Sequence, residues 1–180
     1  MPRSNNPGNI LAGQSYAGQT EDTYTGATSG LTYTTFDSPE MGLRAIFKDV
    51  RKKLKDFDND VEDVLLKYLG GDEGTKEQKY AKAAIHNDDP EGYIQRARKA
   101  YEEEGERGLV KQIIINENKP EHRDYYLDNT EAMDIAEKLS ILDLPSTASY
   151  VDALELYNQG EYHTGGMIQR NPYPYNPRPI

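Results

Sequence analysis

Hydrophobic residues recur at helical spacing through most of the chain beyond residue 38. The clearest run begins after Ser38, which precedes a proline suited to the first helical turn and then Glu40. Six apolar positions then fall on one helix face, whereas the intervening lysines and Arg51 fall mostly on the other: Leu43, Ile46, Phe47, Val50, Leu54 and Phe57. This pattern predicts an amphipathic helix with a basic outer face.

Start and stop signals predict six further helices downstream. Asp60, Thr75, Asp89 and Thr130 are the expected N-caps of four of them. Thr75 with Gln78 forms a capping-box pattern. The remaining two are expected around residues 109–114, after a break bracketed by Gly105 and Gly108, and from about Ser149 to Tyr157.

The segment before residue 38 has a different pattern. Residues 23–25 and 31–36 alternate as short strands do, and residues 26–30 between them are rich in turn formers. We therefore expect one small, exposed β-hairpin on an otherwise helical domain, so that the fold class is mainly α (α+β).

The end of the chain is rich in proline and tyrosine. Four of the ten prolines fall in the last nine residues, a density that neither a helix nor a central strand tolerates. We expect residues 1–144 to form the domain, 145–160 a short helical extension, and 161–180 an extended tail. Such a tail suits docking in a groove on another protein. The expected partner-binding residues are Arg170, Tyr173, Tyr175, Arg178 and Ile180.

Composition narrows the chemistry. The 180 residues carry a net charge of −10 and no cysteine, which excludes disulfides and thiolate metal sites and disfavours binding to nucleic acid. No pair among the three histidines has metal-ligand spacing, and we expect neither a metal nor a cofactor. No apolar run approaches the roughly 20 residues that span a bilayer, so we expect no membrane partner.

Two segments together resemble a known family. Residues 3–10 (RSNNPGNI) and 36–45 (FDSPEMGLRA) are similar to the opening of lysozyme-like phage virion proteins, with an R-x-N-N-P-G-N-I stretch and an F-x-S-P-E-x-G-x-R-A helix. Weaker likenesses follow in residues 59–65, 87–94 and 109–117. The asparagine loop also resembles, distantly, the loop beside the cleft of wall-cleaving glucosaminidases.

The resemblance implies a lysozyme-like domain with a sugar-binding groove between loop, hairpin and helices. The substrate-binding residues would be Asn5, Asn6, Asn9, Tyr16, Tyr24 and Tyr33. It also implies a virion protein in a multi-copy assembly that contacts other particle proteins and peptidoglycan. From the residues alone, the three asparagines are more simply explained by a rigid loop that locks the hairpin onto the helices.

Glycan cleavage needs a carboxylic acid beside the scissile bond. Glu117 and Glu40 are the candidate catalytic residues. Glu117 follows an apolar helix and is expected half-buried, whereas Glu40 lies in a first helical turn, where an anion is favoured as a cap. His86-Asn87 stands where the family has an E-N pair, so that carboxylate is missing. An active chain would be a glycan-strand hydrolase or lytic transglycosylase of peptidoglycan acting during genome entry. The alternative is a non-catalytic structural or adaptor protein that docks through its tail.

Overall fold

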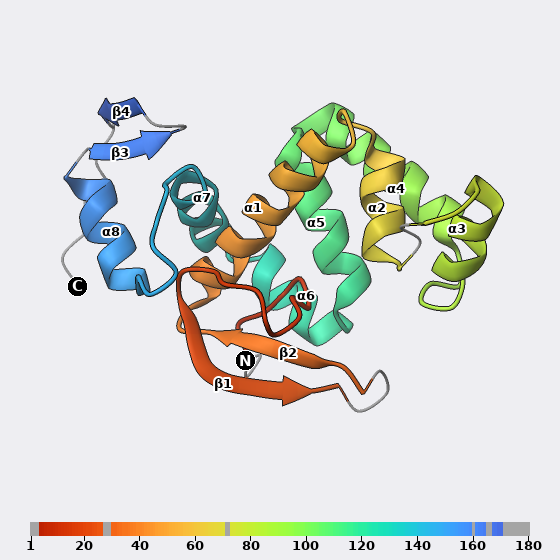
Figure 1. Cartoon of the computed structure of the whole chain (residues 1–180), viewed down its shortest axis with the longest axis horizontal. Coiled ribbons are helices and arrows are strands. Elements are labelled where there is room, and N and C mark those ends of the chain that lie inside the picture. Colours follow the sequence, from red (N-terminus) through yellow and green to blue (C-terminus); the bar gives the residue numbers. More distant parts are fainter. Residues whose placement is uncertain (1–3, 27–29, 71–72, 160, 165–166, 171–180) are drawn as a thin grey trace. The chain divides into compact units, whose positions relative to one another are not determined.

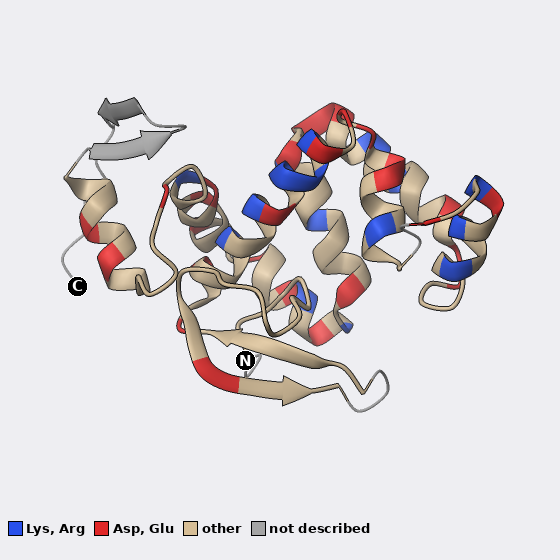
Figure 2. Ribbon diagram, in the orientation of Figure 1, with Lys and Arg blue, Asp and Glu red and all other residues tan. Residues whose placement is uncertain are grey.

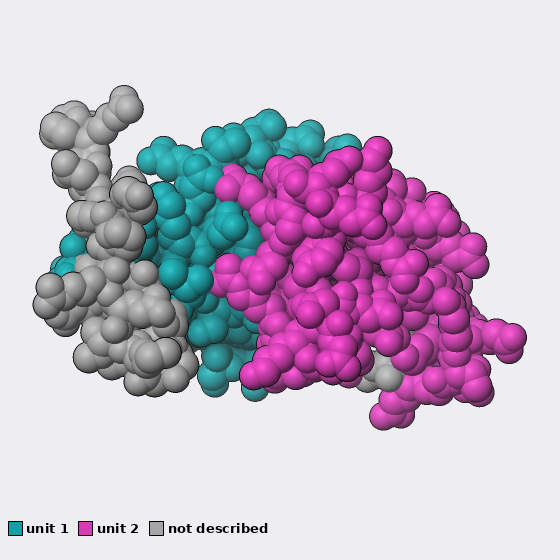
Figure 3. Space-filling view, turned by 90° about the horizontal axis from the view of Figure 1, so that it is seen from above, with its two compact units in different colours: residues 1–48, 117–180 teal, residues 49–116 magenta. Residues whose placement is uncertain are grey.

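The computed structural model of the chain describes residues 4–26, 30–70, 73–159, 161–164 and 167–170 (Figure 1). Within these residues it has eight helices and two separate two-stranded antiparallel sheets. The prediction of a mainly helical fold with a small hairpin is therefore confirmed. The chain divides into two compact units, one of residues 1–48 with 117–180 and the other of residues 49–116 (Figure 3).

The first unit contains the predicted hairpin. Strands β1 (Gln19–Thr25) and β2 (Thr32–Phe36) pair with Tyr24 opposite Tyr33, and an irregularity between Gln19 and Thr23 bends β1. The helices of this unit are the first part of α1 and three later ones: α1 (Pro39–Asp56), α6 (Pro120–Leu127), α7 (Thr130–Leu139) and α8 (Tyr150–Asn158).

The asparagine loop at residues 5–9 contacts α1 through two glycines. A Cβ on Gly42 would lie 1.7 Å from the carbonyl oxygen of Asn5, so only glycine allows the loop backbone to rest on α1 at this point. Gly8 on the loop approaches α1 in the same way, because its Cβ would lie 2.6 Å from Cγ1 of Ile46. The two motifs of the sequence resemblance therefore pack directly on each other.

Side chains of the loop then bind the hairpin. The buried Asn6 amide donates to the carbonyls of Ile10 and Thr34, at 2.9 and 3.0 Å, and accepts a hydrogen bond from the Ile10 amide. Asn5 donates to the Phe36 carbonyl at 3.1 Å. Because these bonds join side chains of the loop to carbonyls of β2, Asn5 and Asn6 lock the hairpin to the loop, as the structural interpretation of the asparagines expects.

Arg44 connects α1 to the end of α7. Its side chain is 1% exposed, and its guanidinium donates to the carbonyls of Leu139 and Leu142, each at 3.0 Å. Burial lowers the pKa of Arg44 to about 10, against a raising contribution from Asp143, so the side chain remains charged at neutral pH. A cation at a helix C-terminus pairs both with the unsatisfied carbonyls and with the helix dipole.

The second unit holds the rest of α1 and four further helices: α2 (Val61–Tyr68), α3 (Lys76–Ala83), α4 (Pro90–Glu104) and α5 (Glu106–Glu117). The last residue of α5, Glu117, belongs to the first unit. Their caps agree with the sequence. Asp60 and Asp89 cap α2 and α4, and Thr75 forms the capping box with Gln78. The predicted break occurs at Gly105, where φ is 63°.

Three details differ from the prediction. Gly108 lies inside α5 rather than in the break, because α5 packs so closely there that a Cβ would lie 2.0 Å from the Ala100 carbonyl oxygen. Helix α6 was not predicted; its only buried residue is Tyr126, so it has no hydrophobic period to detect. The N-cap of α7 is Asn129, which accepts from the Ala132 amide, and Thr130 is the first helical residue.

A second, unpredicted hairpin lies in the segment expected to be an extended tail. Strand β3 (Glu161–Thr164) pairs antiparallel with β4 (Met167–Arg170). Arg170 ends β4, and its side chain lies outside the described part of the structure. Tyr173, Tyr175, Arg178 and Ile180 also lie outside the described residues, so their predicted docking role stays a prediction.

The contact between loop and α1 predicts a large effect of Gly42→Ala. We expect the free energy of unfolding to fall by about 3 kcal/mol, because the new methyl group forces two backbones apart. Gly30→Ala is the control: Gly30 has a positive φ of 65° but open space around it. It should cost only about 1 kcal/mol of backbone strain. Urea denaturation measures both, and equal losses would contradict the close packing.

Candidate functional site

The first unit contains a cleft of about 710 Å³. Its walls come from the asparagine loop, from β1 and β2, and from the residues that end α5 and begin α6. It thus lies where the sequence resemblance places a groove, beside loop and hairpin. A volume of this size is within the range of small-molecule sites.

A row of three side chains crosses one wall of the cleft. Asn9 Nδ2 donates to Oε2 of Glu117 and to the Glu117 carbonyl, each at 3.0 Å. The Tyr24 hydroxyl donates to Oδ1 of Asn9 at 3.1 Å. Asn9 has a φ of 47°, a left-handed conformation that asparagine tolerates better than most residues. Both ends of its amide are therefore committed, and Asn9 fixes a carboxylate and a phenol relative to each other.

Tyr24 is supported from behind by Tyr33. The two rings are stacked across the hairpin, with centroids 5.1 Å apart. Burial is the main reason that the pKa of Tyr24 is raised; a hydrogen bond with Ser4 lowers it, and Tyr33 and Glu117 raise it further. Tyr24 is therefore a neutral phenol at physiological pH, and its ring is held in place on β1.

Charged residues of the cleft are mostly acidic. Asp22, Glu117 and Glu121 supply three carboxylates, against the ammonium of Lys119 and the imidazole of His122. The charged residues of β1 are all acidic, whereas lysines and arginines lie mainly on the helices (Figure 2). Such a lining repels phosphates and other anions, so it favours a neutral or cationic ligand.

Tyr126 is a cleft residue that the sequence analysis missed. It lines the cleft from α6, is 1% exposed, and its hydroxyl has no hydrogen-bond partner in the described structure. Burial raises its pKa well above the ordinary value, with smaller contributions from Tyr125 and Tyr24. No signal in the sequence identified it, because α6 itself gave no periodic pattern.

The structure brings together only some of the predicted site residues. Asn9, Tyr24 and Glu117 meet in the cleft, and Tyr33 supports Tyr24. Asn6 also lines it, although its amide is bonded to backbone groups. The others are not among the lining residues: Asn5 bonds to Phe36, Tyr16 donates to Gln14, and Glu40 lies in the first turn of α1.

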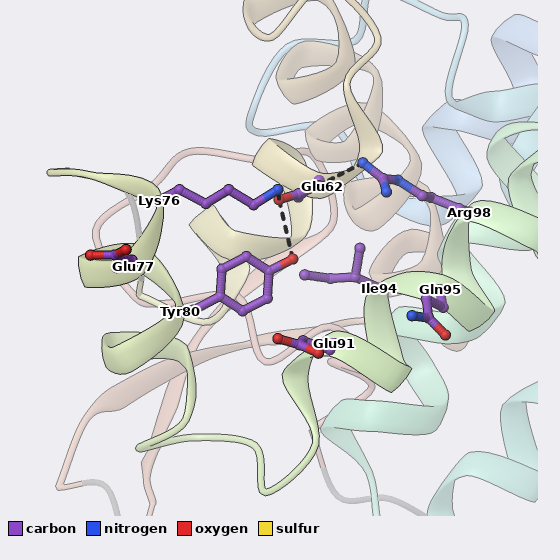
Figure 4. Close-up of a pocket in the computed structure, with 8 residues that line it drawn as sticks. All are labelled: Glu62, Lys76, Glu77, Tyr80, Glu91, Ile94, Gln95 and Arg98. Carbon is purple, nitrogen blue, oxygen red and sulfur yellow. Dashed lines mark hydrogen bonds and ion pairs between the residues drawn. The ribbon is translucent and has the colours of Figure 1, made fainter.

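The second unit has its own smaller pocket of about 400 Å³ between α2, α3 and α4 (Figure 4). Glu62, whose side chain is 12% exposed, accepts from Lys76 at 2.6 Å, from Arg98 at 2.7 Å and from Tyr80 at 3.1 Å. Burial alone would raise the pKa of Glu62, but these three partners outweigh it and lower the pKa. The two cations of this pocket, Lys76 and Arg98, are both paired with Glu62. The network therefore has a structural role, because it joins α2, α3 and α4.

The expected second-half motif has a structural use in this unit. Asn87 accepts a hydrogen bond from the Asp89 amide at 2.7 Å, and its side-chain amide donates to Asn116 on α5. His86 is exposed beside it. This pair therefore adds no carboxylate to a site, and Asn87 fixes the start of α4 to α5.

In comparisons with known proteins, no family model, no curated protein and no solved structure matches the chain. Of the described helices, none combines the length and apolar character needed to cross a bilayer. Acidic and histidine side chains of the described residues nowhere gather in a group that could hold a metal ion.

The raised pKa of Tyr24 predicts a pH dependence of stability. The folded chain retains the Tyr24 proton above the ordinary pKa of 10.0, where the unfolded chain loses it. Stability that is present below pH 10 is therefore lost as the pH rises through the folded-state pKa. Tyr24→Phe should lower the unfolding free energy at pH 7 by about 1 kcal/mol, through loss of the bond to Asn9.

The same variant should flatten the alkaline decline. Urea unfolding of wild type and Tyr24→Phe, measured from about pH 9 to about pH 11, gives the two slopes. Identical slopes would show that the Tyr24 hydroxyl does not titrate differently in the folded and unfolded chains.

Proposed function

We propose that this chain is a phage particle protein whose cleft binds the glycan strand of bacterial peptidoglycan, and that Glu117 is the acid with which it cuts that strand. The observation that carries the proposal is the carboxylate of Glu117, held in place by Asn9 inside a cleft lined with tyrosines. The phage and virion part is supported by the two sequence motifs of the loop and α1.

The cleft offers the groups that sugars bind. Sugar rings have apolar faces that pack on aromatic rings, and their hydroxyls pair with fixed amides, phenols and carboxylates. The ring of Tyr24 supplies an aromatic surface, and the Glu117 carboxylate held by Asn9 supplies a fixed hydrogen-bonding group. The acidic lining also argues against nucleic acid as the ligand, because each phosphate would be repelled.

Cleavage requires a proton donor and, in most enzymes of this kind, a second carboxylate on the other side of the bond. Glu117 is the carboxylate whose position is set by a side-chain hydrogen bond to the loop. Asp22 on β1 and Glu121 on α6 lie in the lining as candidates for the second group. Because the cleft is lined by the loop, the hairpin and α6, the proton donor and the second carboxylate can come from different elements on either side of the bound sugar.

One observation favours a non-catalytic alternative. Asn5 and Asn6 donate their side-chain amides to backbone carbonyls of the hairpin and of Ile10, so two of the three asparagines stabilise the fold rather than contact a ligand. A particle protein that retains this scaffold for binding or assembly would need no more. In that case the cleft holds glycan without cutting it, and the chain connects neighbouring particle proteins.

The experiment uses purified peptidoglycan sacculi and three proteins. Wild type should co-sediment with the sacculi and release soluble muropeptides. Glu117→Gln keeps the shape and hydrogen bonding of the side chain but cannot supply a proton, so release should fall by a factor of about 100 or more while co-sedimentation remains. Glu155→Gln, on the exposed face of α8, is the matched control and should behave as wild type.

The outcomes separate the two parts of the proposal. Co-sedimentation without release by any of the proteins would refute cleavage and support the binding alternative. Equal release by wild type and Glu117→Gln would show that another group is the acid. If the wild type neither sediments with sacculi nor releases muropeptides, peptidoglycan is not the ligand.

A further inference from the structure

The hydroxyl of Tyr126 is an exception among the buried polar groups of this chain. It is the one buried side-chain oxygen or nitrogen in the described residues that has no hydrogen-bond partner. Two other polar side chains of the same cleft are bonded within the protein, Asn9 to Glu117 and Tyr24 to Asn9. Large majorities of buried polar groups are paired in folded proteins, so an unpaired one calls for a reason.

An unpaired buried hydroxyl lowers the stability of the chain that carries it. The phenol has lost its hydrogen bonds to water and gained none from the protein, whereas phenylalanine would fill the same space without that loss. The ring itself is well placed, since it packs edge-on against Tyr125 with centroids 5.2 Å apart. Packing thus explains an aromatic ring at this position but does not explain the hydroxyl.

The location of Tyr126 supplies the reason. It lines the cleft together with Asn9, Tyr24 and Glu117. We propose that the Tyr126 hydroxyl is a ligand-binding donor, kept without a protein partner so that it can bind a neutral oxygen of the sugar in the cleft. The inference rests on the proposed function and adds to it a residue that selects the ligand.

Two properties of the cleft define the acceptor. Burial raises the pKa of Tyr126, so the phenol stays protonated at physiological pH and can donate a hydrogen bond to a neutral oxygen. The carboxylates of Asp22, Glu117 and Glu121 line the same cleft and disfavour an anionic acceptor. A sugar hydroxyl, ring oxygen or acetamido carbonyl fits both conditions.

The test compares Tyr126→Phe with Tyr125→Phe. Tyr125 is adjacent on α6, carries the same hydroxyl and is not among the residues that line the cleft, so it is a matched control. Two quantities are measured for each protein: the urea midpoint of unfolding, and the affinity for the tetramer of N-acetylglucosamine by calorimetry. The tetramer is a neutral probe of the glycan strand.

We expect Tyr126→Phe to unfold at an equal or higher urea concentration than wild type and yet to bind the tetramer about tenfold more weakly. Tyr125→Phe should bind as wild type does. A variant that gains stability while losing affinity marks a group retained for the ligand, because a structural hydroxyl would change stability in the opposite direction.

Other results would overturn the inference. Unchanged affinity of Tyr126→Phe would show that the hydroxyl does not contact the sugar. A lower urea midpoint than that of Tyr125→Phe would show that the hydroxyl already has a partner in the folded chain, such as an ordered water. If the wild type itself does not bind the tetramer, the proposed function fails, and the role of Tyr126 fails with it. If the wild type binds and Tyr126→Phe binds equally well, only the Tyr126 inference fails.

Discussion

The contact between the asparagine loop and α1 is the constraint on which the candidate site depends. Gly42 lets the Asn5 carbonyl rest against the helix, and Gly8 lets the loop return over Ile46. With the loop backbone fixed there, Asn9 is presented to Glu117 and to Tyr24 at hydrogen-bond distance. A shift of the loop by the width of one methyl group would break both of these bonds, so the backbone contact and the site are one arrangement.

The three asparagines of the loop have different roles. Asn5 and Asn6 bind carbonyls of the hairpin and the loop, and only Asn9 points its amide at side chains of the cleft. The structural and the functional interpretation of the motif therefore apply to different residues. Arg44 has a comparable structural role on α1, because its buried guanidinium donates to the Leu139 and Leu142 carbonyls at and beyond the end of α7.

Helices with a clear apolar stripe or a cap could be predicted from the sequence, and α1, α2, α3 and α4 begin where their caps place them. Local signals failed where tertiary contacts decide the structure. Helix α6 buries little besides Tyr126, and Gly108 is demanded by the approach of α5 to Ala100 rather than by a turn. Within the site, Asn9, Tyr24 and Glu117 could be named in advance. Their hydrogen bonds could not be predicted from the sequence, because they join residues up to 108 positions apart in the chain. The place of Tyr126 in the cleft likewise became visible only in the folded structure.

The most direct test of the account is an NMR titration of the full chain with a purified tetrasaccharide fragment of the glycan strand. We predict that the chemical shifts of Asn9, Tyr24, Glu117 and Tyr126 change together along one saturating curve, while those of residues 49–116, outside the cleft-bearing unit, stay unchanged. Shifts that change only within residues 49–116, or no change at all at saturating sugar, would contradict the claim that the loop and hairpin form a glycan-binding cleft.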